Sequence, residues 1–281
     1  MRLILLTSLT MIAFAANSLL NRAGILAGAD PVAFGAVRLI SGALVLSALA
    51  FWNGKGLHLT DRTRIGGVLA LLGYIYGFSL AYRGIDAGIG ALILFGTVQV
   101  TMFAGAILGG ETLPRNRAIG ALIASFGLVW LLWPSEGAKV ALGPGLFMLV
   151  AGISWGVYSL LGRKAGDPLA TTAANFLLAS VPGLFLLGLF QWPSGAALFL
   201  AIASGAVTSG LGYALWYALL PQLGAGRAAV AQTTVPVLAL VGGVMLLGEV
   251  PGLGILLPAA VVLAGVAISL LPQRKIGSNG S

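Results

Sequence analysis

The chain has 281 residues, of which 59% are hydrophobic and 8% are charged, and its mean hydropathy is +1.03. A water-soluble domain cannot bury that much apolar surface, so the composition predicts an all-α polytopic membrane protein. The formal net charge of +8 comes from Lys and Arg in short connections between apolar runs, which argues against nucleic acid as a partner. The sequence contains no cysteine, which excludes disulfides, thiolate metal sites and cysteine nucleophiles.

A helix needs about 20 apolar residues to cross the hydrocarbon of a bilayer. Ten runs qualify, at about residues 3–26, 31–52, 65–83, 87–109, 116–134, 143–163, 169–191, 195–220, 226–247 and 252–271. The most delicate boundary is the turn Gln191–Gly195, since it lies inside the stretch from Pro168 to Gly226, which has no charge to mark it; the length of that stretch requires two spans. Ala13-Phe14-Ala15 resembles a signal-peptide cleavage site. The internal repeat described below argues against that reading.

Lys and Arg in the connections predict the orientation. If the N-terminus is cytoplasmic, the inside segments carry 11 of these residues and the outside segments carry 3, namely Arg22, Arg83 and Lys139. This excess predicts that both termini lie in the cytoplasm.

Two stretches half a chain apart resemble each other: Asn17-Ser-Leu-Leu-Asn-Arg22 and Tyr158-Ser-Leu-Leu-Gly-Arg163. Similar shifts superpose Asp30-Pro31 on Asp167-Pro168 and Gly110-Glu111 on Gly248-Glu249. Each unit then holds five spans, and because five is odd the second unit enters the membrane from the opposite side. The predicted units are residues 1–139 and 140–275, followed by a disordered tail or vector remnant at 276–281. Inverted repeats are typical of secondary transporters, whose substrates bind between the halves near the midplane.

These features resemble a known family. Tandem five-helix units, an Arg early in the second helix, Gly-Glu after the fourth and ninth helices, and Pro236-Val237 ahead of Gly265-Val266 are similar to the EamA family of the drug/metabolite transporter superfamily. Within it, the chain most resembles YddG-type exporters of aromatic amino acids. The resemblance implies a multi-pass protein of the bacterial inner membrane that exports a small organic metabolite. One departure is Val98, which stands where the second half has Pro236.

The acidic residues bear on coupling. All seven lie in connections, and His58, the single histidine, lies in a predicted cytoplasmic loop. Proton-coupled transporters usually place such groups inside the membrane, so the sequence predicts uncoupled, facilitated transport without cofactor or metal; sodium coupling stays open. Glu111 and Glu249 are expected to interact with the N-termini of the helices that follow them. Gly152-Ile-Ser154-Trp-Gly156 matches a hydrolase motif, but it lies mid-helix without a histidine partner, so catalysis is not expected.

Arg38 is the single charged residue within a predicted span, roughly 10 Å from the outer helix end at 1.5 Å per residue. It contacts substrate or a gate, or it extends outward and pairs with a carboxylate such as Asp30 or Glu249. Its counterpart in the repeat is Asn175.

Helices 1 and 6 carry the first candidate substrate residues. Thr10, Phe14, Asn17 and Asn21 share one helix face, and the repeat matches Phe14 with Trp155 and Asn17 with Tyr158. The two faces are expected to meet across a cavity; ordinary helix-to-helix hydrogen bonding is the alternative.

The predicted helices at 65–83 and 195–220 are rich in aromatic residues. In the first, Tyr74, Phe78 and Tyr82 are spaced by four. In the second, one face carries Ser209, Tyr213, Trp216 and Tyr217. Phe78, Tyr82, Tyr213, Trp216 and Tyr217 are candidates for lining the cavity, although Tyr82 could instead be an interfacial anchor.

The predicted helix at 226–247 contains Gln232, Thr233 and Pro236. Pro236 lacks an N–H, so it should free the Gln232 carbonyl and act as a hinge. Gln232 and Thr233, with Gln99 in helix 4, complete the candidate substrate residues.

The sequence therefore predicts a transporter of a small organic metabolite that works by alternating access of two inverted halves, and the resemblance implies that it exports aromatic amino acids. The alternatives are a broad drug or metabolite exporter, possibly proton-coupled, a membrane enzyme and a channel. The partners expected are a small-molecule substrate and the lipid bilayer. The oligomeric state is not fixed by the sequence, and a monomer is compatible with it.

Overall fold

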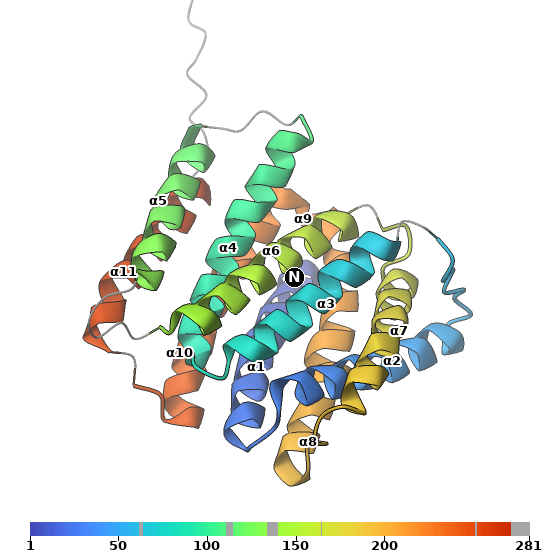
Figure 1. The fold of residues 1–281 in the computed structure, drawn as a ribbon. Coiled ribbons are helices and arrows are strands. Elements are labelled where there is room, and N and C mark those ends of the chain that lie inside the picture. Colours follow the sequence, from blue (N-terminus) through green and yellow to red (C-terminus); the bar gives the residue numbers. More distant parts are fainter. Residues whose placement is uncertain (62–63, 111–114, 134–139, 164, 251, 271–281) are drawn as a thin grey trace, which may run out of the picture.

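A computed structural model describes residues 1–61, 64–110, 115–133, 140–163, 165–250 and 252–270. The described residues form only helices and connections (Figure 1). The helices are α1 Arg2–Leu26, α2 Pro31–Trp52, α3 Arg64–Ala81, α4 Ala87–Leu108, α5 Arg115–Leu132, α6 Leu142–Gly162, α7 Pro168–Leu187, α8 Gly195–Ala203, the π-helix η1 Ser204–Leu211, α9 Gly212–Gln232, α10 Thr234–Leu247 and α11 Leu253–Leu270. Seven helices among the described residues are long and apolar enough to cross a membrane, and three more are apolar but shorter. The prediction of a polytopic helical membrane protein is confirmed.

The second helix of each predicted unit begins with the same local device. Asp30 Oδ1 accepts hydrogen bonds from the backbone N–H groups of Val32 and Ala33 at 2.8 and 3.2 Å, and Pro31 occupies the first helical position. Asp167 accepts from the N–H of Ala170 at 3.0 Å, again ahead of a proline. An Asp cap followed by Pro satisfies the unpaired N–H groups of a helix start.

The boundary expected near residues 221–225 is wrong. Helix continues without interruption from α8 through η1 and α9 to Gln232, and the break falls at Thr233. Pro236 is the third residue of α10, in the first turn, where a missing N–H costs no helical hydrogen bond. The predicted span 226–247 is therefore broken at Thr233, three residues before Pro236, and the role of Pro236 as a hinge stays a prediction.

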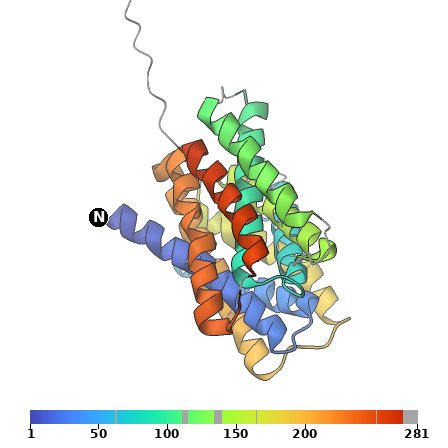
Figure 2. The same ribbon diagram turned by 90° about the vertical axis from the view of Figure 1, so that its left-hand side faces the viewer.

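Helix packing joins the two predicted units throughout. α2 packs against α7, α5 packs against α11, and α6 packs against both α3 and α4. α1 packs against α8, η1 and α9, and also against α10. Figure 2 shows α5 and α11 side by side on the face turned to the viewer, and the N-terminal part of α1 projecting from the bundle at the left.

Ion pairs mark two opposite ends of the bundle. At the Arg22 end, Arg22 pairs with Asp86 and with Glu249, both at 3.3 Å, and Arg83 pairs with Asp30 at 2.8 Å. At the Lys55 end, where α2 terminates, Lys55 pairs with Asp167 at 2.6 Å. The largest fully buried side chains lie between these ends, and they include Trp155, Trp216, Arg38 and four tyrosines.

Candidate functional site

Side chains from both predicted units meet in the middle of the bundle. We call this group the central cluster, and each member has at most 6% of its surface exposed. Its members are Phe14, Asn17, Arg38, Tyr74 and Phe78 from the first unit and Trp155, Ser204, Thr208, Ser209, Tyr213 and Trp216 from the second.

Aromatic rings form the apolar part of the central cluster. The ring of Phe14 contacts those of Trp155 at 5.4 Å, Trp216 at 5.6 Å and Tyr213 at 5.8 Å between centroids, each close to edge-to-face. Trp155 and Tyr213 lie 4.5 Å apart. Such pairs contribute about 0.5–1.5 kcal/mol beyond the area they bury. Phe14 and Trp155, which the repeat matches with each other, therefore do face each other, and their rings are in contact.

Arg38 lies fully buried in the polar part of the cluster. Its Nε donates to Ser209 Oγ at 2.7 Å, and its Nη2 donates to the hydroxyls of Tyr213 at 2.6 Å and Tyr74 at 3.2 Å. The guanidinium carbon also lies 5.2 Å from the ring centre of Tyr74 and 5.1 Å from that of Phe78. Nη1 has no hydrogen-bond partner among the residues that the structure describes.

The alternative that Arg38 extends outward to a carboxylate is wrong. Asp30 pairs with Arg83, and Glu249 pairs with Arg22, so both carboxylates are already engaged at the Arg22 end. The hydroxyls of Tyr74 and Tyr213 hold the guanidinium inside the bundle instead.

Asn17 is the hub of the hydroxyl groups. Its Oδ1 accepts hydrogen bonds from Ser204 at 2.7 Å, Thr208 at 2.9 Å and Ser209 at 3.3 Å. Its Nδ2 donates to Tyr74 and Tyr213 hydroxyls at 3.2 and 3.3 Å, and these two hydroxyls lie 2.9 Å apart. Asn17 and Arg38 thus share three partners, and the two side chains belong to one network.

The π-helix η1 explains why three hydroxyls reach one oxygen atom. Hydrogen bonds from residue i to i+5 widen its turn, so positions 204, 208 and 209 all face Asn17. Gly205 permits the close approach to α2, because a Cβ atom there would overlap Ser41 Oγ and the Arg38 carbonyl. Ser204 and Thr208 were not predicted as site residues. Their spacing of four residues, which places them on one helix face, was the signal that could have found them.

The remaining aromatic candidates extend the cluster toward both ends. Tyr217 packs on Tyr158 with ring centres 4.9 Å apart and donates its hydroxyl to the Tyr158 carbonyl at 2.8 Å, near the C-terminal end of α6. In the other direction, Tyr82 packs edge-on against Phe78 at 4.7 Å and is fully buried. The alternative that Tyr82 is an interfacial anchor is therefore wrong.

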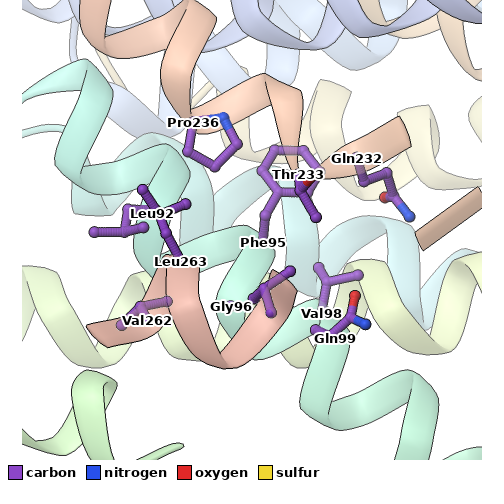
Figure 3. A pocket seen from close by; sticks show the side chains of 11 residues that line it. Leu92, Phe95, Gly96, Val98, Gln99, Gln232, Thr233, Pro236, Val262 and Leu263 are labelled. Atoms are coloured by element: carbon purple, nitrogen blue, oxygen red, sulfur yellow. The ribbon is translucent and has the colours of Figure 1, made fainter. Parts of the chain in front are cut away.

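Gln232 connects the central cluster to the break between α9 and α10. Trp155 Nε1 donates to Gln232 Oε1 at 3.3 Å. Gln232, Thr233 and Pro236 also line a cavity of about 10 Å³ together with Gln99 (Figure 3), which is close to the volume that one water molecule needs. Gln99 Nε2 donates to Ser269 Oγ at 3.0 Å, so Gln99 joins α4 to α11 and does not reach the central cluster through this bond.

Glu249 holds the Arg22 end together. Its two oxygens accept from the backbone N–H of Ala87, at 2.9 and 3.0 Å, and Oε1 also accepts from Arg22. Burial raises the pKa of Glu249, against the opposing effects of the Ala87 N–H and Arg22. Glu249 therefore caps the N-terminus of α4. The sequence predicts that it interacts with the N-terminus of the helix that follows it in the chain, and the described contacts are with α4 instead. Glu111 and the tail at 276–281 lie outside the described residues.

Nothing in the described part of the chain assembles a catalytic or metal centre. Ser154 lies in the interior of α6, so its G-x-S-x-G context does not form a strand-to-helix turn. No group of three or more His, Asp or Glu residues capable of holding a metal occurs among the described residues.

Comparison with known proteins identifies the chain's relatives. The EamA-like transporter family matches residues 144–271. The chain is 30% identical to the threonine/homoserine exporter RhtA of Salmonella typhimurium, over 85% of this chain and 82% of that one. The chain belongs to the EamA-like transporter family. Because this family is one of transporters, the chain is a multi-pass membrane transporter for a small molecule.

Other relatives agree with this assignment. The chain is 48% identical to the uncharacterized protein PA1977 of Pseudomonas aeruginosa, over 97% of this chain and 96% of that one. It is 28% identical to a probable amino-acid metabolite efflux pump of Salmonella typhimurium, over 68% of this chain and 70% of that one. The chain also matches a solved crystal structure at 22% sequence identity. The match covers 94% of this chain and 96% of the other, and its TM-score of 0.69 shows a shared fold.

Proposed function

We propose that this transporter exports amino acids across the bacterial inner membrane and prefers those with aromatic side chains. The central cluster is the observation that carries the proposal. It surrounds a buried guanidinium and several neutral hydroxyls with the rings of Phe14, Phe78, Trp155 and Trp216. Such a site suits a ligand with an apolar ring and a polar end. The exporter and efflux relatives named above support amino acids as the class, while the preference for aromatic ones rests on the rings and on the resemblance to YddG-type exporters.

Alternating access of two inverted halves is the mechanism we propose. Helix packing supports it, because the contacts of α1 resemble those of its counterpart α6 with the two units exchanged. α1 packs on α8, η1 and α9 of the second unit, and α6 packs on α3 of the first. α1 also packs on α10 of the second unit, and α6 packs on α4 of the first. The pairs α2–α7 and α5–α11 each join equivalent helices. A two-fold axis between the units would produce this exchange, and five spans per unit would make the axis lie in the membrane plane.

The proposed orientation places the Lys55 end and both termini in the cytoplasm. It rests on the excess of Lys and Arg in the connections on that side. Facilitated transport without a coupling ion is the proposed energetics. The acidic residues that the structure describes lie outside the helices, and the described members of the central cluster include no carboxylate.

Counterflow in proteoliposomes tests this proposal. Labelled Phe, Trp, Thr and a cationic dye would be offered to reconstituted protein with and without a pH gradient. We expect saturable counterflow of Phe and Trp, slower counterflow of Thr, none of the dye, and no stimulation by the gradient. Preference for the dye would support a broad drug exporter instead. Strong stimulation by the gradient would contradict uncoupled transport, and absence of saturation would indicate a channel.

Two substitutions test the central cluster directly. Trp155→Ala removes the ring that contacts Phe14, Tyr74 and Tyr213, and Gln232→Ala removes the partner of the Trp155 N–H. We expect both to abolish counterflow in protein that is still folded by circular dichroism and gel filtration, although the cavity left by Trp155→Ala should cost about 3–5 kcal/mol of stability. Matched controls are Trp52→Ala, which is 88% exposed, and Gln222→Ala, also on the surface. Normal transport by both cluster variants would show that the site lies elsewhere.

A further inference from the structure

We propose that Arg38 binds the carboxylate of the transported molecule, so that the substrates of this protein are carboxylic acids. The inference rests on the proposed function, because it takes the central cluster to be the substrate site. It assigns one chemical group of the substrate to one side chain, and it can stand even if the preference for aromatic side chains is wrong.

The first argument is the charge of Arg38. The guanidinium is fully buried among membrane-spanning helices, and within the described chain it forms no salt bridge. Taking a cation out of water costs several kcal/mol even after the protein relaxes. Hydroxyl groups and the ring faces of Tyr74 and Phe78 return part of this cost, but none of them carries a negative charge. The positive charge of Arg38 is therefore not neutralised by the described residues, and one anion bound beside it would neutralise it.

The second argument is the unused donor. Nε and Nη2 of Arg38 donate to hydroxyls, whereas Nη1 is buried and has no partner in the described part of the chain. A guanidinium offers pairs of parallel N–H groups that match the two oxygens of a carboxylate, and such bidentate pairs are about twice as strong as neutral hydrogen bonds. Nη1 and Nη2 form one such pair of donors. Nη1 is free to bind a carboxylate oxygen, while Nη2 donates to the hydroxyls of Tyr74 and Tyr213.

The third argument is the nature of the present partners. Tyr74 and Tyr213 accept hydrogen bonds from Arg38, but a tyrosine hydroxyl can also donate. When a carboxylate reaches the guanidinium, the two hydroxyls can turn from accepting to donating and bind the same oxygen atoms. The cluster as observed is then the substrate-free arrangement, with neutral hydroxyls in the place of the anion.

A purely structural role for Arg38 predicts something different. Arg38 joins α2 to α3 through Tyr74 and to η1 and α9 through Ser209 and Tyr213. If that were its whole role, its replacement would lower thermal stability and would not alter which chemical class of ligand binds. The experiment must therefore measure selectivity between ligands that differ in the carboxylate alone.

Ligand-induced shifts in thermal stability provide this measurement. Purified protein would be heated in the presence of matched acids and amides: phenylalanine and phenylalaninamide, threonine and threoninamide, benzoate and benzamide. We expect at least one acid to raise the Tm of the wild-type protein and its amide to bind roughly 10- to 100-fold more weakly, as loss of a charge-assisted hydrogen bond implies. Arg38→Met should remove the difference between acid and amide. Arg38→Lys should restore part of it, because it keeps the charge without the fork. Arg83→Met is the matched control, since Arg83 is half exposed at the Arg22 end and paired with Asp30, and it should bind as the wild type does.

Each outcome decides between the two proposals. If threonine and not phenylalanine shows the Arg38-dependent preference over its amide, the carboxylate assignment stands and the aromatic preference fails. If amides stabilise the wild-type protein as well as acids do, or if no acid stabilises it, the assignment to Arg38 is wrong. If Arg38→Met does not fold, the Arg38→Lys variant decides: an acid-to-amide preference as large as in the wild type contradicts the bidentate pairing.

Discussion

The Arg22 end and the central cluster treat arginine in opposite ways. Arg22 pairs with Asp86 and Glu249 and donates to the Tyr82 carbonyl at 2.8 Å, and Arg83 pairs with Asp30. Arg38, which is more deeply buried than either, contacts hydroxyls and ring faces. The cost of burying a charge rises with depth, so one would expect the deepest arginine to be paired best. The contrast teaches that the arginines at the Arg22 end are neutralised by carboxylates of the protein, whereas the guanidinium of the central cluster has no carboxylate partner among the described residues.

The largest effect should come from giving the central cluster the missing carboxylate. Asn17→Asp has nearly the same shape and lies one hydroxyl away from Arg38, because Tyr74 and Tyr213 bind both side chains. The new carboxylate should act as an internal counter-ion and compete with the substrate. We expect carboxylate transport to fall by at least about 10-fold, as loss of a charge-assisted interaction implies, with no fall in Tm.

The matched control is Asn53→Asp at the exposed end of α2, which should transport normally. Counterflow and thermal melts of the two variants give the comparison. Normal carboxylate transport by Asn17→Asp would show that the charge of Arg38 is not used.

A smaller effect is expected at the Arg22 end, from Glu249→Gln. The folded-state pKa of Glu249 is raised above its ordinary value of 4.5 by burial, so the folded protein holds this proton more tightly than the unfolded chain does. The contribution of Glu249 to stability is then greatest below the unfolded pKa and falls as pH rises through the folded pKa. Glu249→Gln mimics the protonated form, so its Tm relative to wild type should rise between acid and neutral pH. A Tm difference that falls with pH would mean that the pair with Arg22 dominates.

The smallest effect should come from Asp167→Asn at the Lys55 end. Lys55 and the Ala170 N–H lower the pKa of Asp167, so its contribution is present above its unfolded pKa and is lost as pH falls through the folded pKa, which is the opposite sign to that of Glu249. Asn also caps helices well, and partly exposed ion pairs contribute about 0–1 kcal/mol. Thermal melts at neutral pH should show a loss within that range. A larger loss would mean that this pair is part of a wider network.

The sequence predicts the helical architecture better than its boundaries. Apolar length is a strong signal, and it predicts the spans formed by α1 to α7 within a few residues. The boundary near 221–225 fails because Pro221 is accommodated inside α9, so a proline alone does not stop a helix in this setting. Near Pro236 the predicted span 226–247 divides at Thr233 into the end of α9 and α10, so the sequence located a break in this region without predicting that two helices form.

The candidate site divides in the same way. Phe14 and Trp155 were matched with each other by the repeat, and their rings are in contact. The partners of Arg38 do not follow from it. Ser209 and Tyr213 reach Arg38 from the η1–α9 segment, where an eight-residue π-helix shifts every later side chain off the α-helical period. No residue pattern in Ser204–Leu211 predicts that this segment forms a π-helix.

Gly205 gives a criterion for sorting relatives of this protein. Any side chain at that position would collide with Ser41 and with the Arg38 backbone, and would push the π-helix away from α2. The hydroxyls of Ser204, Thr208 and Ser209 would then lose their common acceptor, Asn17. A relative that has a bulkier residue there, even one that keeps the arginine and the asparagine, cannot build the same polar core, and its cargo should not be inferred from this one.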